Sequence, residues 1–189
     1  MGHIVDLGCG SGVLVKFLYD NGYSVTGIDQ SPHMISIARE KVPNGNFIVN
    51  SFYSCEIPPC SAVTATGECF NYLFDKSHSL SSLRELFKRI FSSLDRSGLF
   101  IFDFAMPGRI SSSTKRRWNF DSFSMDVEHV ENDKDKILTR NIKLEFQTNN
   151  GIKEDKETHR LTLFEKEELH CLLIEAGFIP QFVTGFGSF

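Results

Sequence analysis

Apolar residues in the first half of the chain follow two alternating patterns, one typical of strands and one typical of helices. Short apolar runs are separated by stretches in which apolar residues recur at helical spacing. Strands that alternate with helices in this way predict an α/β fold with a doubly wound, mostly parallel sheet. The expected strands are Ile4–Leu7, Tyr23–Ile28, Phe47–Val49, Ala62–Thr66 and Gly98–Phe104, and the expected helices are Val13–Asp20, Pro32–Lys41 and Leu80–Leu94. Gly98–Phe104 is almost continuously apolar, which predicts a strand that is covered on both faces.

The pattern changes after Gly108, where polar and apolar residues alternate strictly, as in an antiparallel meander. We interpret residues 109–163 as a β-rich insertion over the ligand-binding side of one domain that spans residues 1–189, because the segment is too small to hold a core alone. The expected strands are Ser124–Glu131, Ile137–Gln147 and Lys153–Leu163, followed by a helix at Glu165–Ala176 and a last strand at Phe178–Thr184. Solvated loops are expected at Ser111–Thr114 and Lys115–Arg117; contact of this basic run with an anion is the alternative.

Bulk composition excludes several classes of protein. The 189 residues carry a net charge of −4, which gives no general attraction to nucleic acid or to an anionic membrane. No stretch approaches the ~20 apolar residues of a membrane span, and the N-terminus lacks the pattern of a signal peptide. The five cysteines form no CxxC pair, so we expect a reduced, cytoplasmic protein without a metal site.

The segment Val5–Gly12 reads Val-Asp-Leu-Gly-Cys-Gly-Ser-Gly and lies between an expected strand and an expected helix. Glycine tolerates backbone angles that other residues avoid, and a helix N-terminus presents free N–H donors. The carboxylate of Asp6 would repel a pyrophosphate but attract an ammonium or a ribose hydroxyl. The loop therefore predicts a zwitterionic or nucleoside ligand.

A second carboxylate supports this prediction. Asp29 closes the second expected strand, 17 residues after Gly12, and can accept hydrogen bonds from the hydroxyls of a ribose. The dinucleotide fingerprint would place its third glycine at position 13, where this chain has Val13. An NAD-dependent oxidoreductase is thus disfavoured.

Several segments resemble class I S-adenosylmethionine-dependent methyltransferases. Val5–Gly12 and Gly27–Met34 are similar to the first two motifs of that family. Ala65–Leu73, His159–Leu161 and Glu165–Phe178 are similar to its small-molecule branch. The resemblance implies a Rossmann-like fold, S-adenosylmethionine as the cofactor, S-adenosylhomocysteine as its product, and a small-molecule acceptor.

The resemblance also implies roles for single residues. Asp6 would lie near the ammonium of the cofactor, Asp29 would bind the ribose hydroxyls, and Ser51 stands where the family often has an acid. Met34 would contact the adenine or belong to the core. The full set of implied cofactor residues is Asp6, Gly8, Cys9, Gly10, Gly12, Asp29, Gln30, Met34, Ser51, Phe52, Thr66 and Gly67.

Candidate acceptor-binding residues come from the later segments: Glu68, Asn71, Tyr72, Trp118 and His159. Asn71 and Tyr72 are also compatible with an ordinary helix start, His159 with a structural role, and Trp118 with a lid or a packing anchor. Glu68, His159 and Tyr72 are the candidates for a general base, which methyl transfer needs only when the acceptor must lose a proton early. The Asn-Pro-Pro-Tyr-type motif of enzymes that methylate planar amines is absent after the fourth strand, which disfavours nucleic-acid bases.

The family normally has helices before the first strand and an additional antiparallel strand at the end. Here the first strand begins three residues after Met1 and the sequence stops at Phe189. We hypothesise a chain that is shortened at both ends, with an unpaired sheet edge. A homodimer through that edge or through the meander is one expectation. A module that binds the cofactor, has lost turnover and acts through a partner is the alternative to an enzyme.

Overall fold

The computed structural model describes residues 2–110, 113–148 and 151–183, and these form two compact units. The core unit comprises Met1–Thr66, Ser79–Phe102 and Lys166–Phe189. The meander unit comprises Gly67–His78 and Asp103–Glu165. The meander unit thus contains the expected insertion and, in addition, the segment that follows the fourth strand.

The core unit is built on a five-stranded parallel sheet in the order β3-β2-β1-β4-β5. This topology confirms the predicted α/β fold. Because β1 lies between β2 and β4, the chain reverses its winding direction at the carboxyl end of β1, where ligands of such sheets bind. The strands are β1 (His3–Leu7), β2 (Ser24–Asp29), β3 (Asn46–Val49), β4 (Cys60–Ala65) and β5 (Leu94–Phe102).

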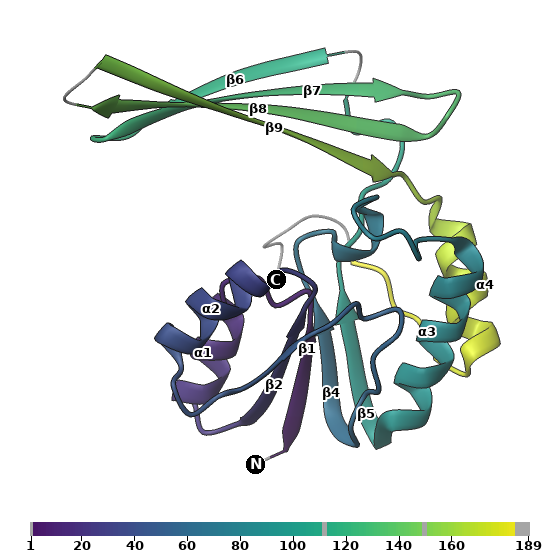
Figure 1. Cartoon of the computed structure of the whole chain (residues 1–189). Helices are drawn as coiled ribbons and strands as arrows, with labels where there is room; N and C mark the ends of the chain where they lie inside the picture. Colours follow the sequence, from purple (N-terminus) through teal and green to yellow (C-terminus); the bar gives the residue numbers. More distant parts are fainter. Residues whose placement is uncertain (1, 111–112, 149–150, 184–189) are drawn as a thin grey trace. The chain divides into compact units, whose positions relative to one another are not determined.

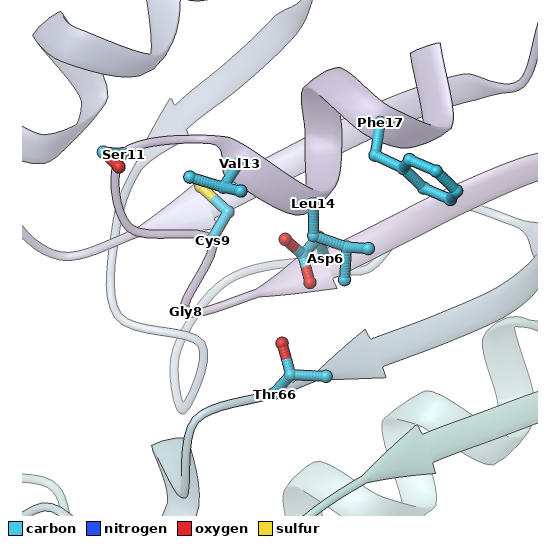
Figure 2. A pocket seen from close by; sticks show the side chains of 8 residues that line it. All are labelled: Asp6, Gly8, Cys9, Ser11, Val13, Leu14, Phe17 and Thr66. Atoms are coloured by element: carbon cyan, nitrogen blue, oxygen red, sulfur yellow. The ribbon is translucent and has the colours of Figure 1, made fainter. Parts of the chain in front are cut away.

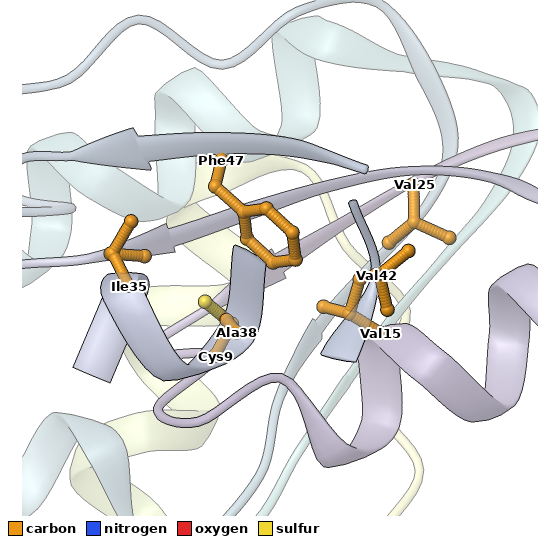
Figure 3. Close-up of a cluster of buried hydrophobic side chains, with 7 residues drawn as sticks. All are labelled: Cys9, Val15, Val25, Ile35, Ala38, Val42 and Phe47. Atoms are coloured by element: carbon orange, nitrogen blue, oxygen red, sulfur yellow. The ribbon is translucent and has the colours of Figure 1, made fainter. Parts of the chain in front are cut away.

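Helices cover both faces of this sheet (Figure 1). The helices α1 (Val13–Asp20) and α2 (Pro32–Lys41) lie on one face, and α3 (Leu80–Ser93) and α4 (Lys166–Ala176) lie on the other. Ser31 caps α2 by accepting a hydrogen bond from the Met34 amide, as its position before Pro32 predicts. The buried cluster under α1 and α2 consists of Cys9, Val15, Val25, Ile35, Ala38, Val42 and Phe47 (Figure 3).

The meander unit contains a four-stranded antiparallel sheet in the order β6-β7-β8-β9. Its strands are β6 (Ser113–Asn119), β7 (Phe123–Asn132), β8 (Ile137–Thr148) and β9 (Gly151–Thr162). A short 3-10 helix, η1 (Cys69–Asn71), precedes a bridge between Tyr72 and Leu161. The small core of this unit consists of Ala105, Leu138, Leu161 and Leu163, against which Tyr72 and Ile110 pack.

Three expectations about secondary structure are wrong. The basic run Lys115–Arg117 and the residues before it form strand β6 and not a loop, because β7 supplies a backbone hydrogen-bonding partner along the whole segment. Ser111 and Ser112 lie outside the described residues. No strand forms over Phe178 to Val183, and Thr184 lies outside the described part of the chain.

The third error concerns β5, which the apolar pattern predicts to be covered on both faces. Among the described residues it lies at the edge of its sheet, and the side chains of Leu99 and Ile101 are exposed, so one face is uncovered. A homodimer through this edge stays a prediction. No helix within residues 2–110, 113–148 and 151–183 is long and apolar enough to cross a membrane.

Candidate functional site

The glycine-rich segment forms a tight loop between β1 and α1. Gly8, Gly10 and Gly12 all have positive φ angles, of 68°, 51° and 73°, which side chains with a Cβ rarely adopt. The backbone amides of Gly8 and Cys9 donate hydrogen bonds to the carbonyl of Ile28, at 2.7 and 3.1 Å. The loop is therefore held against the carboxyl end of β2.

Asp29 fastens the same loop from the end of β2. Its Oδ2 accepts a hydrogen bond from the Gly10 amide at 2.9 Å, and its Oδ1 accepts one from the Ser31 amide at 2.8 Å. A carboxylate offers about four lone-pair directions, so two remain for an external donor such as a hydroxyl. The Asn50 amide donates to the Asp29 carbonyl at 3.0 Å, which brings the segment after β3 beside this residue.

Asp6 is an ionisable group with only 3% of its surface exposed, near the end of β1. Thr64 Oγ1 donates a hydrogen bond of 2.6 Å to its carboxylate. Burial raises the pKa of Asp6 from 3.8 to about 6; the Thr64 hydrogen bond opposes this shift and the negative charge of Asp29 adds to it. A cation bound beside Asp6 would favour its ionised form.

A cavity of about 450 Å³ opens where these groups meet (Figure 2). This volume lies in the range of small-molecule sites. Four of the residues expected to bind cofactor lie on its wall, and α1 and the glycine loop supply four that the sequence did not predict. The lining residues are Asp6, Gly8, Cys9, Thr66, and the additional Ser11, Val13, Leu14 and Phe17.

The sequence of α1 contains a signal that could have identified the additional lining residues. Helix α1 carries more apolar residues than one buried stripe can hold, and only Val15 among them is buried. Val13 and Phe17 are 67% and 63% exposed. Apolar side chains in excess of a single helix face indicate a second apolar surface, which here is the cavity wall.

The residues expected around an adenine lie outside this cavity lining. Gln30 and Met34 are exposed, with Met34 at 41%, so Met34 is not a core residue. Ser51 Oγ accepts a hydrogen bond from the Tyr53 amide at 3.1 Å, and the Phe52 carbonyl accepts one from Arg89 at 3.0 Å. Ser51 and Phe52 thus belong to a turn that follows β3.

The comparisons with known proteins agree with this geometry. Residues 4–98 match the family described as "Methyltransferase domain". The chain belongs to this methyltransferase family. Its fold is similar to that of a solved S-adenosylmethionine-dependent methyltransferase, as the resemblance predicted.

Two relatives and one solved structure show the extent of the similarity. A provisionally named methyltransferase of Geobacillus sp. (strain WCH70) is 34% identical over 53% of this chain and 41% of its own length. YqeM of Bacillus subtilis (strain 168), also a provisional methyltransferase name, is 29% identical over 97% of this chain and 76% of its own. The crystal structure of an S-adenosylmethionine-dependent methyltransferase from Clostridium acetobutylicum ATCC 824 has a TM-score of 0.79 and 20% identity, over 92% of this chain and 72% of that one. The match thus spans about two fifths of the Geobacillus relative.

In this methyltransferase, the backbone just beyond Thr66 has an unusual conformation. Gly67 and Glu68 have positive φ angles of 93° and 60°. Asp103 stabilises this turn, because its carboxylate accepts hydrogen bonds from the amides of Gly67, at 2.7 Å, and Glu68, at 3.2 Å. A non-glycine residue with positive φ is uncommon and is often found where function demands it.

Glu68 and Tyr72 belong to a partly buried polar network of the meander unit. The Glu68 carboxylate is bound by Arg109 and by Arg140, the latter at 3.1 Å. Arg140 also donates to the Tyr72 hydroxyl at 2.9 Å and to His129 Nε2 at 3.2 Å. Burial raises the pKa of Tyr72, whereas burial and the charge of Arg140 lower the pKa of His129. Sequence reasoning missed Arg109, Arg140 and His129.

The remaining candidates are placed differently. Asn71 is fully buried, and its side chain donates to the carbonyls of Ala105 and Thr162 at 3.0 and 2.6 Å. Its amide hydrogens are thus committed to the fold. His159 contacts the ring of Tyr72 edge-on, and its Nε2 lies 3.0 Å from the Glu157 carboxylate. Trp118 lies on β6 and is 38% exposed.

Proposed function

We propose that this methyltransferase transfers the methyl group of S-adenosylmethionine to a small-molecule acceptor. One observation carries the proposal. The buried Asp6 and part of the glycine loop lie on the wall of one cavity, and Asp29 holds that loop in place. A buried carboxylate beside a tight glycine loop, with the carboxylate of Asp29 behind that loop, suits a ligand that carries both a cation and hydroxyl groups.

The residues present fit this cofactor. Asp6 would hold the ammonium, the loop from Gly8 to Gly12 would receive the methionine part, and Asp29 would accept hydrogen bonds from the ribose hydroxyls. Gln30, Met34, Ser51 and Phe52 would surround the adenine, and Thr66 and Gly67 would lie near the sulfonium. The apolar side chains of Val13 and Phe17 would exclude water from one side of the cavity.

The chemistry demands little of the protein. When bound, S-adenosylmethionine supplies a methyl group on a positively charged sulfur, which a nucleophile of the acceptor displaces directly. The residues of the chain then act by holding the acceptor in line and by excluding water. Because the reaction requires little proton transfer, it does not depend on a free general base among the candidate residues.

Those candidate bases are all engaged in other contacts. Both oxygens of Glu68 are bound by guanidinium groups, and the pKa of Tyr72 is raised by burial, so neither group is ready to remove a proton. His159 is paired with Glu157 through Nε2, and its Nδ1 is buried, so neither ring nitrogen is presented to an acceptor. We therefore propose that the acceptor transfers no proton to these three side chains.

Calorimetric titration with S-adenosylmethionine, S-adenosylhomocysteine and NAD tests the proposal. We expect both sulfur nucleosides to bind and NAD to leave no signal; binding of neither sulfur nucleoside would refute the proposal. An assay for transfer of labelled methyl groups to a fractionated metabolite extract then separates an enzyme from a binding module. Labelled product that disappears with Asp29→Ala supports turnover at this site, whereas cofactor binding without any labelled product favours the module.

A further inference from the structure

One face of the meander sheet gathers guanidinium groups around His129. The strand register places Thr114, His129, Arg140 and His159 in one row across β6, β7, β8 and β9. Arg116 lies two residues beyond Thr114 and therefore on the same face. Positive charges of Arg140, Arg109 and Arg116 act on His129, against the carboxylate of Glu68.

Three acidic groups near this row are committed to other partners. Glu131, two residues beyond His129, accepts hydrogen bonds from the amides of Gly108 and Ile110 at 2.6 and 3.1 Å. Glu157 lies beside His159 at the other side of the row. Glu68 is shared between two arginines. None of these pairs includes Arg116.

Arg116 is exposed, and its side chain makes no hydrogen bond or ion pair with the residues that the structure describes. The next residue, Arg117, points to the opposite face and is fully engaged. It pairs with Asp126 at 2.9 Å, with Ser124 at 2.7 Å and with Glu145. The two neighbouring arginines thus differ, because the guanidinium of Arg117 has acidic partners and that of Arg116 lacks a counter-charge among the described residues.

The charged row continues into an apolar surface. Arg116 is aligned with Val127 and Ile142 across the strands. The next row on the same face consists of Trp118, Met125 and Leu144, with Asp155 on β9, at the opposite edge of the sheet from Arg116. A guanidinium beside apolar and aromatic side chains fits a ligand that has an oxyanion on an apolar or planar body.

We propose that Arg116 binds a carboxylate or phosphate group of the methyl acceptor, whose apolar part lies against Trp118. This inference rests on the proposed function and names the class of its acceptor. Each charge-assisted hydrogen bond to the oxyanion adds to affinity and orients the acceptor.

Trp118 is the only tryptophan of the sequence, so its fluorescence reports binding on this face. The whole chain, saturated with S-adenosylhomocysteine, is titrated with benzoate, phenyl phosphate and the neutral benzamide. We expect a saturable change with at least one of the two anions and affinity at least about tenfold lower for benzamide. The anion that binds more tightly shows whether a carboxylate or a phosphate is preferred.

Two exposed arginines on one strand provide a matched comparison. Arg116→Gln should lower the affinity for the preferred anion at least about tenfold, whereas Arg117→Gln on the opposite face should leave it unchanged. Arg116→Lys, which keeps the charge but loses the bidentate fork, should fall between the two.

Three results would overturn the inference: equal binding of benzamide and the anions, equal losses in the two Gln variants, or no saturable change with either anion. Calorimetry with S-adenosylhomocysteine is run on the same samples. Loss of that signal refutes the proposed function, whereas normal nucleoside binding without anion binding refutes only the acceptor class.

Discussion

The carboxylate of Asp29 accepts a hydrogen bond of 2.9 Å from the backbone amide of Gly10. The two residues are 19 positions apart in the chain, and this bond joins the end of β2 to the middle of the glycine loop. The same carboxylate holds the Ser31 amide at the start of α2. One side chain thus organises the loop and keeps lone pairs for a ligand.

Replacing this carboxylate should affect both stability and binding. Asp29→Ala leaves two amides without their acceptor, which we expect to lower the free energy of unfolding by about 1–3 kcal/mol. Affinity for S-adenosylhomocysteine should fall at least about tenfold. Urea denaturation and calorimetry measure the two effects. The control is Asp20→Ala, which removes an exposed carboxylate paired with Lys16 and should change neither.

Asp6 predicts a pH dependence of stability in the free protein. Its pKa is about 6 in the folded state and 3.8 as the ordinary value, so between these values the folded state binds more protons than the unfolded state. Asp6 therefore contributes about 3 kcal/mol to the free energy of unfolding below pH 3.8, and this contribution is lost as the pH rises through 6. Denaturation of Asp6→Asn across this range should lack that slope; an unchanged slope would show that another group causes it.

Binding should follow the opposite trend, because a cationic ligand needs the ionised form of Asp6. Affinity for S-adenosylhomocysteine should rise with pH by up to about tenfold per unit below pH 6 and level off above it. Calorimetry at a series of pH values measures this profile. Asp6→Asn should bind weakly at every pH, without the rise, and a wild-type affinity that is flat from pH 5 to 7 would contradict the prediction.

Two glycines of the loop provide a test of packing. A Cβ at Gly12 would lie 2.8 Å from the Cβ of the buried Ala38, whereas a Cβ at Gly10 would meet nothing within 4 Å. Both have positive φ, so each alanine carries the strain of that conformation, about 1–2 kcal/mol. Gly12→Ala should therefore lower the melting temperature clearly more than Gly10→Ala. Equal losses would mean that α2 moves away at little cost.

Asp103 is predicted to act by positioning the turn at Gly67 and Glu68. Asp103→Ala removes the acceptor of two backbone amides, and we expect methyl transfer to slow while affinity for S-adenosylhomocysteine stays within about twofold. Asp103→Asn, which keeps one acceptor oxygen, should recover part of the rate. Steady-state kinetics with an identified acceptor measures the change, and Asp133→Ala in an exposed turn is the control. A rate unaffected by Asp103→Ala would exclude the positioning role.

Local signals explain which elements could be predicted. Helix α2 has a capping serine and a first-turn proline, and its predicted bounds, Pro32–Lys41, agree with the structure. Helix α1 likewise has the predicted bounds, Val13–Asp20. The glycine spacing and the two acids identified the loop, because a tight turn with positive φ needs glycine at particular positions.

Strand β6 shows why other elements could not be predicted. Lys115–Arg117 has no apolar side that would indicate a strand, and its extended conformation depends on the partner β7, where Asp126 also pairs with Arg117. The apolar run after Gly177 shows the opposite case, a predicted strand that does not form. Its composition favours a strand, yet an apolar run forms one only with a partner strand to pair with, and Phe178 to Val183 form none.

The sequence by itself determined the parallel sheet, the loop at its topological switch point and the family, because these depend on short segments with strong conformational preferences. Only the tertiary structure decided that Val13 and Phe17 face a cavity. It alone joined Glu68 to Arg140, 72 positions away. Such contacts arise from strand register and burial, in which the position of each side chain depends on segments far along the chain.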